Sequence, residues 1–154
     1  MKNINQTDLT KAAPRSPYVR IGGFAILGRT IDKCRAELAG LNGDYNFDCP
    51  LDNVLFNFKG IKGSDLKDCI AAGHTDEEIG TWVKSHGRPK TDEEIKAWSD
   101  AFKTDCAYAS NPEKKEWFNE KCAHYGLDPA KTTLFNYLEI DDKASFKTTG
   151  SCPI

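Results

Sequence analysis

The stretch of sequence that decides the fold class is Phe24-Ala-Ile-Leu-Gly-Arg-Thr-Ile-Asp-Lys-Cys-Arg-Ala-Glu-Leu-Ala-Gly-Leu41. Its apolar side chains recur at steps of three and four, the spacing of one helical face: Phe24, Leu27, Ile31, Cys34, Leu38 and Leu41. Arg29 and Lys33 lie opposite this face, and their simplest interpretation is two cations exposed to solvent. The stretch predicts one long amphipathic helix, with Gly40 and Gly43 available to end it.

Helix signals recur along the rest of the chain. The segment Thr75-Asp-Glu-Glu-Ile-Gly-Thr-Trp82 is echoed by Thr91-Asp-Glu-Glu-Ile-Lys-Ala-Trp98, and each copy has the threonine and glutamate of a capping box. Ser64 is expected to cap a short helix. Proline suits the first helical turn and predicts three further starts, at Pro50, Pro112 and Pro129. We expect about seven short helices, with the chain irregular from residue 141 onward.

The composition predicts a compact, single-domain, all-α bundle. The chain has 154 residues, of which 39% are hydrophobic, enough for one core. Pro14 and Pro17 hold the segment before the long helix in an extended conformation, so we expect an N-terminal strip laid across the bundle. The expected domain spans 8–146, between a disordered N-terminus at 1–7 and a loose C-terminal tail at 147–154.

The net charge limits the classes of partner, and the cysteine content indicates the cellular compartment. A net charge of -2 argues against nucleic-acid and membrane binding, which both need clustered cations. The polar start of the chain is unlike a secretory signal, so we expect a soluble, cytoplasmic protein that is a monomer or a small homo-oligomer. Six cysteines would suit three disulfides in a secreted protein, but they are sparse and no pair has CxxC spacing. We therefore expect mostly buried thiols in a reducing compartment and no cofactor: Cys34, Cys49, Cys69, Cys106, Cys122 and Cys152.

Six short motifs occur in order along the first third of the chain: Asp8-Leu-Thr10, Pro14-Arg-Ser-Pro17, Arg20-Ile-Gly-Gly23, Ile31-Asp-Lys33, Gly43-Asp-Tyr45 and Cys49-Pro-Leu-Asp52. Taken together, they resemble a bacterial family, the domain-of-unknown-function family 5069. The resemblance covers most of the chain, roughly 8 to 146. It implies a bacterial origin and a single domain, and it supplies no catalytic residue.

The first candidate site is an anion site near the N-terminus. Glycines let backbone amides approach a ligand, and the guanidinium of arginine matches carboxylate or phosphate groups. The predicted ligand-binding residues are Arg15, Ser16, Arg20, Gly22, Gly23, Arg29 and Lys33. The alternative is that the cations are solvated or form surface pairs within the helix, such as Asp32 with Arg35, and that the two glycines only make a bend.

The second candidate site is catalytic and consists of Cys49 and Asp52. A cysteine at a helix N-terminus feels the positive end of the helix dipole, which favours its reactive thiolate form. Asp52 would oppose that effect, and the three histidines are distant in sequence. The alternative is a packed or capping cysteine. No metal site is expected, because Cys122 and His124 are two residues apart and do not share a helical face.

The sequence leaves the function open between two classes. One is a small cytosolic protein that binds a small anionic metabolite through its Arg/Gly-rich N-terminal segment, with enzymatic activity undecided. The other is a helical protein–protein interaction module without catalytic activity. A deep pocket lined by Arg15, Arg20 and Cys49 would favour the first class, and a flat apolar patch would favour the second. The tryptophans Trp82, Trp98 and Trp117 are expected in the core.

Overall fold

The described helices surround one central helix, α1. The computed structural model describes residues 8–104 and 112–146 of the chain. This part is built from α1 (Leu27–Leu38), α2 (Pro50–Lys59), α3 (Gly63–Ala71), α4 (Asp76–Ser85), α5 (Asp92–Lys103), α7 (Pro112–His124) and α8 (Leu134–Phe146). The prediction of an all-α fold is confirmed, because an isolated bridge between Ile21 and Phe24 is the only β pairing among these residues. The predicted termini at 1–7 and 147–154 lie outside the described part.

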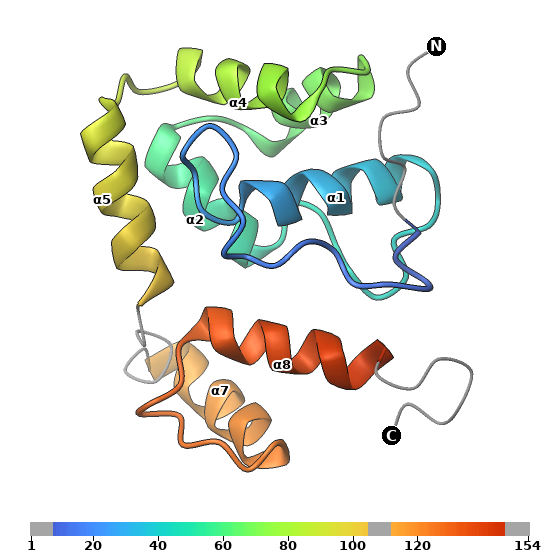
Figure 1. Ribbon diagram of the computed structural model, residues 1–154, viewed down its shortest axis with the longest axis vertical. Coiled ribbons are helices and arrows are strands. Elements are labelled where there is room, and N and C mark those ends of the chain that lie inside the picture. Colours follow the sequence, from blue (N-terminus) through green and yellow to red (C-terminus); the bar gives the residue numbers. More distant parts are fainter. Residues whose placement is uncertain (1–7, 105–111, 147–154) are drawn as a thin grey trace.

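Helix α1 is buried on every side. It passes between α3 and α4 on one side and α8 on the other, as Figure 1 shows. All ten residues from Leu27 to Ala36 are buried. Arg29 and Lys33 are each only 3% exposed, so the expectation of two solvated cations is wrong. The opposite face of an amphipathic helix meets solvent only when no second layer covers it, and here α8 and the N-terminal strip do so.

The buried charges of α1 are paired with charges from other elements. An unpaired charge in a protein interior costs several kcal/mol, so each cation needs a carboxylate close by. The pairs formed across the fold are Arg29 with Asp142 of α8 (2.7 Å), Lys33 with Asp52 of α2 (3.0 Å), Arg35 with Asp76 of α4 (2.9 Å), and Asp32 with Arg15 of the N-terminal strip (3.1 Å). These pairs join α1 to four separate parts of the chain.

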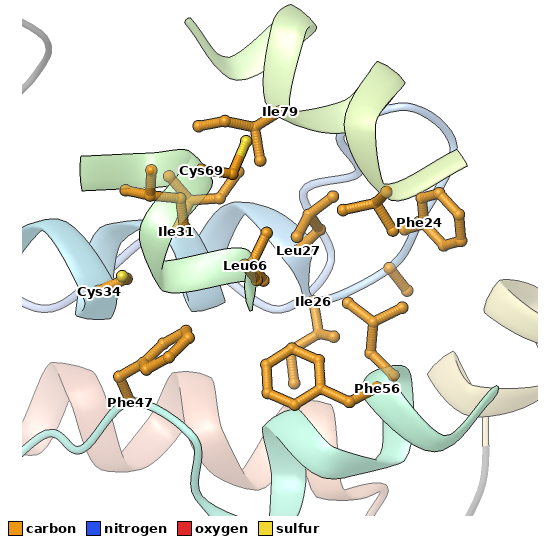
Figure 2. Close-up of a cluster of buried hydrophobic side chains, with 14 of the residues drawn as sticks. Phe24, Ile26, Leu27, Ile31, Cys34, Phe47, Phe56, Leu66, Cys69 and Ile79 are labelled. Atoms are coloured by element: carbon orange, nitrogen blue, oxygen red, sulfur yellow. The ribbon is translucent and has the colours of Figure 1, made fainter. Parts of the chain in front are cut away.

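The apolar core lies around α1 as well. Figure 2 shows Ile31 and Cys34 of α1 packed with side chains from α2, α3 and α4 and from the loop before α2. A second, smaller cluster holds α7 against α8 and contains Phe118, Cys122, Leu134 and Tyr137. Trp117 is adjacent to this cluster but is 42% exposed, so its predicted place in the core is wrong.

The N-terminal strip is fixed by contacts to several helices. The Leu9 amide donates to the Leu41 carbonyl, which ties the strip to the segment after α1. The buried Ser99 hydroxyl of α5 donates to the Gly23 carbonyl and accepts from the Ala25 amide, each at 2.9 Å. A side chain from α5 therefore holds the turn that precedes α1.

Helix boundaries follow the sequence signals in most places. The capping boxes at Thr75 and Thr91 are both present, and α2 and α7 begin at their prolines. Three expectations are wrong. Ser64 caps no helix, because α3 already begins at Gly63. The segment after Pro129 forms turns, so the last helix begins at Leu134.

The third wrong expectation concerns residues 141–146, which are helical rather than irregular. Asp142 lies in this segment and pairs with Arg29, so tertiary contacts support a helix that local sequence signals do not indicate. Among the helices of 8–104 and 112–146, none is both long enough and apolar enough to cross a lipid bilayer.

We predict that Gly22→Ala destabilises the protein more than Gly40→Ala. Both glycines have a positive φ, which costs an alanine about 1–2 kcal/mol. At Gly22 a Cβ would also lie 3.1 Å from the Gly80 Cα of α4, whereas at Gly40 it meets nothing within 4 Å. We expect Gly22→Ala to lower the free energy of unfolding by about 1–3 kcal/mol more than Gly40→Ala, measured by urea denaturation. Equal losses would show that α4 does not press on this turn.

We also predict that Asp76 contributes stability that disappears in acid. Burial alone raises the pKa of Asp76, but hydrogen bonds and positive charges from Arg15 and Arg35 hold the pKa below its ordinary value of 3.8. A lowered pKa means that the contribution is complete above about pH 4 and is lost as the pH falls through the folded-state pKa. Asp76→Asn should cost about 1–3 kcal/mol at neutral pH. Its difference from the unsubstituted protein should shrink below about pH 4.

The matched control is Asp92→Asn. Asp92 occupies the equivalent position of the second capping box but is largely exposed, and within the described residues its ion pair is with Lys84. This substitution should change the free energy of unfolding by less than about 1 kcal/mol at any pH. A difference between Asp76→Asn and the unsubstituted protein that stays constant down to about pH 3 would contradict the prediction.

Candidate functional site

A cavity of about 900 Å³ lies between α1 and the α7–α8 pair. One wall is formed by α1 and by the segment 43–51, which leads into α2. The other wall is formed by α7 and α8. The lining is mixed: three cations (Arg29, Lys33 and Lys114), the thiol of Cys49, and the apolar or aromatic side chains of Leu51, Trp117, Leu134, Tyr137, Leu138 and Phe146. Apolar walls with a few converging polar groups are typical of small-molecule sites.

Lys33 is held at the cavity wall by a buried carboxylate. Its ammonium group lies 3.0 Å from Asp52 Oδ1 and 3.3 Å from the Cys49 sulfur. Asp52 is fully buried and also accepts hydrogen bonds from the Thr30 hydroxyl (2.7 Å) and the Asp48 amide (2.9 Å). These bonds fix the carboxylate, and the carboxylate in turn fixes the lysine beside the thiol.

Arg29 is held in the same way by α8. Its Nη1 and Nη2 atoms donate to the two oxygens of Asp142, at 2.7 and 3.2 Å. The Tyr45 hydroxyl also donates to Asp142, at 2.9 Å, and the guanidinium lies over the Tyr45 ring. Burial and the charge of Asp142 raise the pKa of Tyr45 well above its ordinary value, so its hydroxyl remains a donor at neutral pH.

Cys49 differs from the other cysteines of the described part. It is partly exposed and lines the cavity, whereas Cys34, Cys69 and Cys122 are buried. Burial raises the pKa of the Cys34 thiol to about 12 and also raises the pKa values of Cys69 and Cys122. Cys49 is also the N-cap residue of α2, where its side chain makes no capping hydrogen bond. Ser, Thr, Asp or Asn would cap better, so the thiol is not explained by helix capping.

The structure separates the predicted site residues into two groups. Arg29, Lys33 and Cys49 meet at the cavity, with Asp52 directly behind Lys33. The other predicted residues make contacts within the fold and do not line this cavity: Arg15 with Asp32 and Asp76, Ser16 with Glu139, Arg20 with Asp100, Gly22 with Gly80, and Gly23 with Ser99. A pocket that combines Arg15, Arg20 and Cys49 is therefore not formed in the described part.

Sequence reasoning missed the α7–α8 wall. Lys114, Trp117 and Phe146 line the cavity, yet nothing near them in sequence marks them as site residues. Asp142 is 113 residues from Arg29, so no local pattern links the two. Tyr45 could have been predicted as a site residue, because it ends one of the motifs on which the family resemblance rests.

Within 8–104 and 112–146, no three His, Cys, Asp or Glu side chains are arranged to hold a metal ion. Cys122, considered with His124 as a candidate ligand, is buried in the cluster between α7 and α8. The cavity thus offers cationic donors, a thiol, apolar surface and the carboxylates of Asp44 and Asp141.

Residues 11–144 match the model of a family described as a domain of unknown function (DUF5069). The chain belongs to this family. The match confirms the resemblance identified from the sequence motifs. The DUF5069 domain runs from the N-terminal strip into the last turns of α8, so it contains nearly all of both cavity walls. A search of curated proteins found no match.

We predict strong coupling between Lys33 and Asp52. Asp52→Asn leaves a buried ammonium without its counter-charge, which should cost about 3–5 kcal/mol in free energy of unfolding. The double variant Lys33→Met/Asp52→Asn removes both charges and should cost clearly less than the sum of the two single variants. Urea denaturation of all four proteins measures the coupling. Additive losses would mean that the two charges do not depend on each other.

Proposed function

We propose that this protein binds a small amphipathic anion in the cavity between α1 and the α7–α8 pair. The acid group of the ligand, a carboxylate or a phosphate, would lie against Lys33 and Arg29. The apolar body would lie against the aromatic wall formed by α7 and α8. The observation that carries the proposal is that Arg29 and Lys33, two of the three buried cations of α1, line the same cavity.

The unused hydrogen-bond donors support an anionic ligand. A lysine ammonium has three donors, and Lys33 directs one toward Asp52 and one toward Cys49, which leaves a third. A guanidinium has five N–H donors, and Arg29 directs two toward Asp142 and one toward the Arg15 carbonyl, which leaves about two. Neither side chain can accept a hydrogen bond. A ligand group beside them must therefore be an acceptor, and carboxylates and phosphates are the strongest acceptors available.

The opposite wall supports an apolar or aromatic ligand body. Trp117 is 42% exposed, which is unusual for so large an aromatic side chain, and it lines the cavity with Tyr137 and Phe146. A planar ligand could cover the rings of Trp117 and Phe146 and remove their apolar surface from water. The cavity volume also lies within the range of about 300–1,000 Å³ that is typical of small-molecule sites.

The alternative, a protein-interaction module, has weaker support. The large hydrophobic side chains exposed in the described part are Val19, Leu38 and Trp117. They belong to the N-terminal strip, the end of α1 and the cavity wall of α7, so they come from three separate elements. The four cysteines of the described part are free thiols, which suits a reducing compartment, so the proposal includes a cytoplasmic setting. The bacterial origin implied by the family resemblance is part of the proposal as well.

The test compares an acid with its neutral isostere. Phenylacetate, indole-3-acetate and phenyl phosphate would be titrated against the protein by ligand-observed NMR, with phenylacetamide and indole-3-acetamide as uncharged partners. We expect the anions to bind about tenfold more tightly than the amides, because only they form charge-assisted hydrogen bonds with the cationic wall. Amides that bind as well as acids, or no binding by any probe, would overturn the proposal.

Two neighbouring lysines supply the matched variants. Lys114 lines the cavity, whereas Lys115 on the same helix is exposed and does not. Lys114→Gln should weaken anion binding about three- to tenfold, and Lys115→Gln should leave it unchanged. Equal effects of the two variants would indicate general attraction to surface charge rather than binding in the cavity.

A further inference from the structure

Cys49 carries chemistry that anion binding does not use. It is a partly exposed thiol at the wall of the 900 Å³ cavity, 3.3 Å from a buried ammonium. An ammonium in a protein interior is better satisfied by oxygen acceptors than by sulfur, which is a weak acceptor. Neither helix capping nor packing accounts for this thiol, since it makes no capping hydrogen bond and is not enclosed in the core.

We propose that Cys49 is a thiolation site, which forms a mixed disulfide with an anionic, low-molecular-weight disulfide that enters the cavity. The inference uses the cavity of the proposed function but not the identity of the ligand bound there. The two can therefore fail separately: one concerns a reversible complex, and the other a covalent bond to one sulfur atom.

The exchange step is balanced without any further oxidant. The Cys49 thiol releases its proton to solvent, and the thiolate attacks one sulfur of the incoming disulfide. A new S–S bond forms between Cys49 and that sulfur while the original S–S bond breaks. The other half leaves as a thiolate and takes up a proton from solvent. The incoming disulfide is the oxidant, and Cys49 is oxidised.

Lys33 assists this step by its position. Negative charge is carried first by the Cys49 sulfur, is then shared along the three-sulfur transition state, and finally resides on the departing sulfur. Lys33 Nζ provides a positive charge 3.3 Å from the sulfur at which this charge begins. Because Asp52 fixes the ammonium, little reorganisation is needed when the thiolate reacts. The negative charge of Asp52 offsets part of this attraction, so its contribution to the step is to position the ammonium.

The cavity selects the class of disulfide. Arg29, Lys33 and Lys114 offer donors to carboxylates near Cys49. Asp44 and Asp141 also line the cavity and would accept from an ammonium group. A disulfide derived from amino acids or a short peptide carries both kinds of group. A purely cationic disulfide would lack partners for Arg29, Lys33 and Lys114.

The other described thiols are protected from the same reaction. Cys34, Cys69 and Cys122 are buried and do not line the cavity. Burial raises the pKa of each of them, so their thiolate forms are scarce at neutral pH. The geometry thus favours one site of reaction among these four cysteines.

The experiment exposes the reduced, full-length protein to oxidised glutathione or to cystamine at neutral pH, with peptide-level mass spectrometry to give the rate at each cysteine. Each rate is divided by the rate of the same disulfide with free cysteine. We expect Cys49 to react at least tenfold faster than Cys34, Cys69 and Cys122. We also expect oxidised glutathione to be favoured over cystamine about tenfold after this normalisation. Cys49 labelling no faster than that of the buried thiols, or a preference for cystamine, would overturn the proposal.

Variants separate reactivity from structure. Lys33→Met/Asp52→Asn removes both charges together, so it avoids leaving a buried charge unpaired, and it should slow thiolation of Cys49 about tenfold. Thermal unfolding reports whether this variant is folded. Lys33→Arg keeps the positive charge and should retain most of the rate, which provides a second measurement if the double variant unfolds. Loss of rate in Lys33→Arg equal to that in the double variant would show that the charge is not what activates the thiol.

The stability of Cys49→Ser distinguishes a reactive cysteine from one that serves only in packing. Serine at an N-cap position is favourable, so Cys49→Ser should leave the free energy of unfolding equal or higher while abolishing the adduct on this peptide. A loss of more than about 2 kcal/mol would assign the cysteine to packing and would contradict its reading as a reactive group.

Discussion

The fold depends on the requirement that every charge on the buried part of α1, from Leu27 to Ala36, has a counter-charge. α1 carries Arg29, Asp32, Lys33 and Arg35 in a segment that is buried throughout. Their partners come from α8, the N-terminal strip, α2 and α4. Replacing such pairs with apolar residues is often neutral or stabilising, so their main effect here is on arrangement rather than on total stability. An alternative packing that displaced any of these elements would leave a buried charge alone, which is costly.

The same requirement produces the cavity wall. Asp142 and Asp52 each hold one face of a cation and leave the remaining donors of Arg29 and Lys33 available. The two carboxylates thus hold the cations in fixed positions at the cavity wall. The Cys49 thiol lies beside Lys33 because Cys49 is the N-cap residue of α2, and Asp52 in the first turn of the same helix binds Lys33. Arg29 and Lys33 therefore serve two purposes: they form the buried ion pairs of the fold, and they line the cavity.

Much of the fold follows from local sequence. The capping boxes at Thr75 and Thr91 and the helix starts at Pro50 and Pro112 depend on interactions within one helical turn, which the sequence displays directly. The site is different. The burial of Arg29 depends on Asp142, and the cavity depends on how α7 and α8 pack against α1, so neither is visible in any short window. The helix start predicted at Pro129 was wrong because proline permits a helix start without requiring one. The core position predicted for Trp117 was wrong because the size of an aromatic side chain does not determine whether it faces the core or a cavity.

The long reach of the Arg29–Asp142 pair also bears on synthesis of the chain. The partners of α1 leave the ribosome at very different times: Asp52 soon after the helix, Asp76 later, and Asp142 only after 113 residues separate it from Arg29. Until Asp142 emerges, Arg29 lacks the carboxylate with which it is buried in the folded protein. The helix that begins the core therefore remains hydrated on one face until the last part of the domain has been translated. Final compaction must therefore wait until α8 has left the ribosome, and a chaperone that shields nascent chains would meet this one with one face of α1 still hydrated.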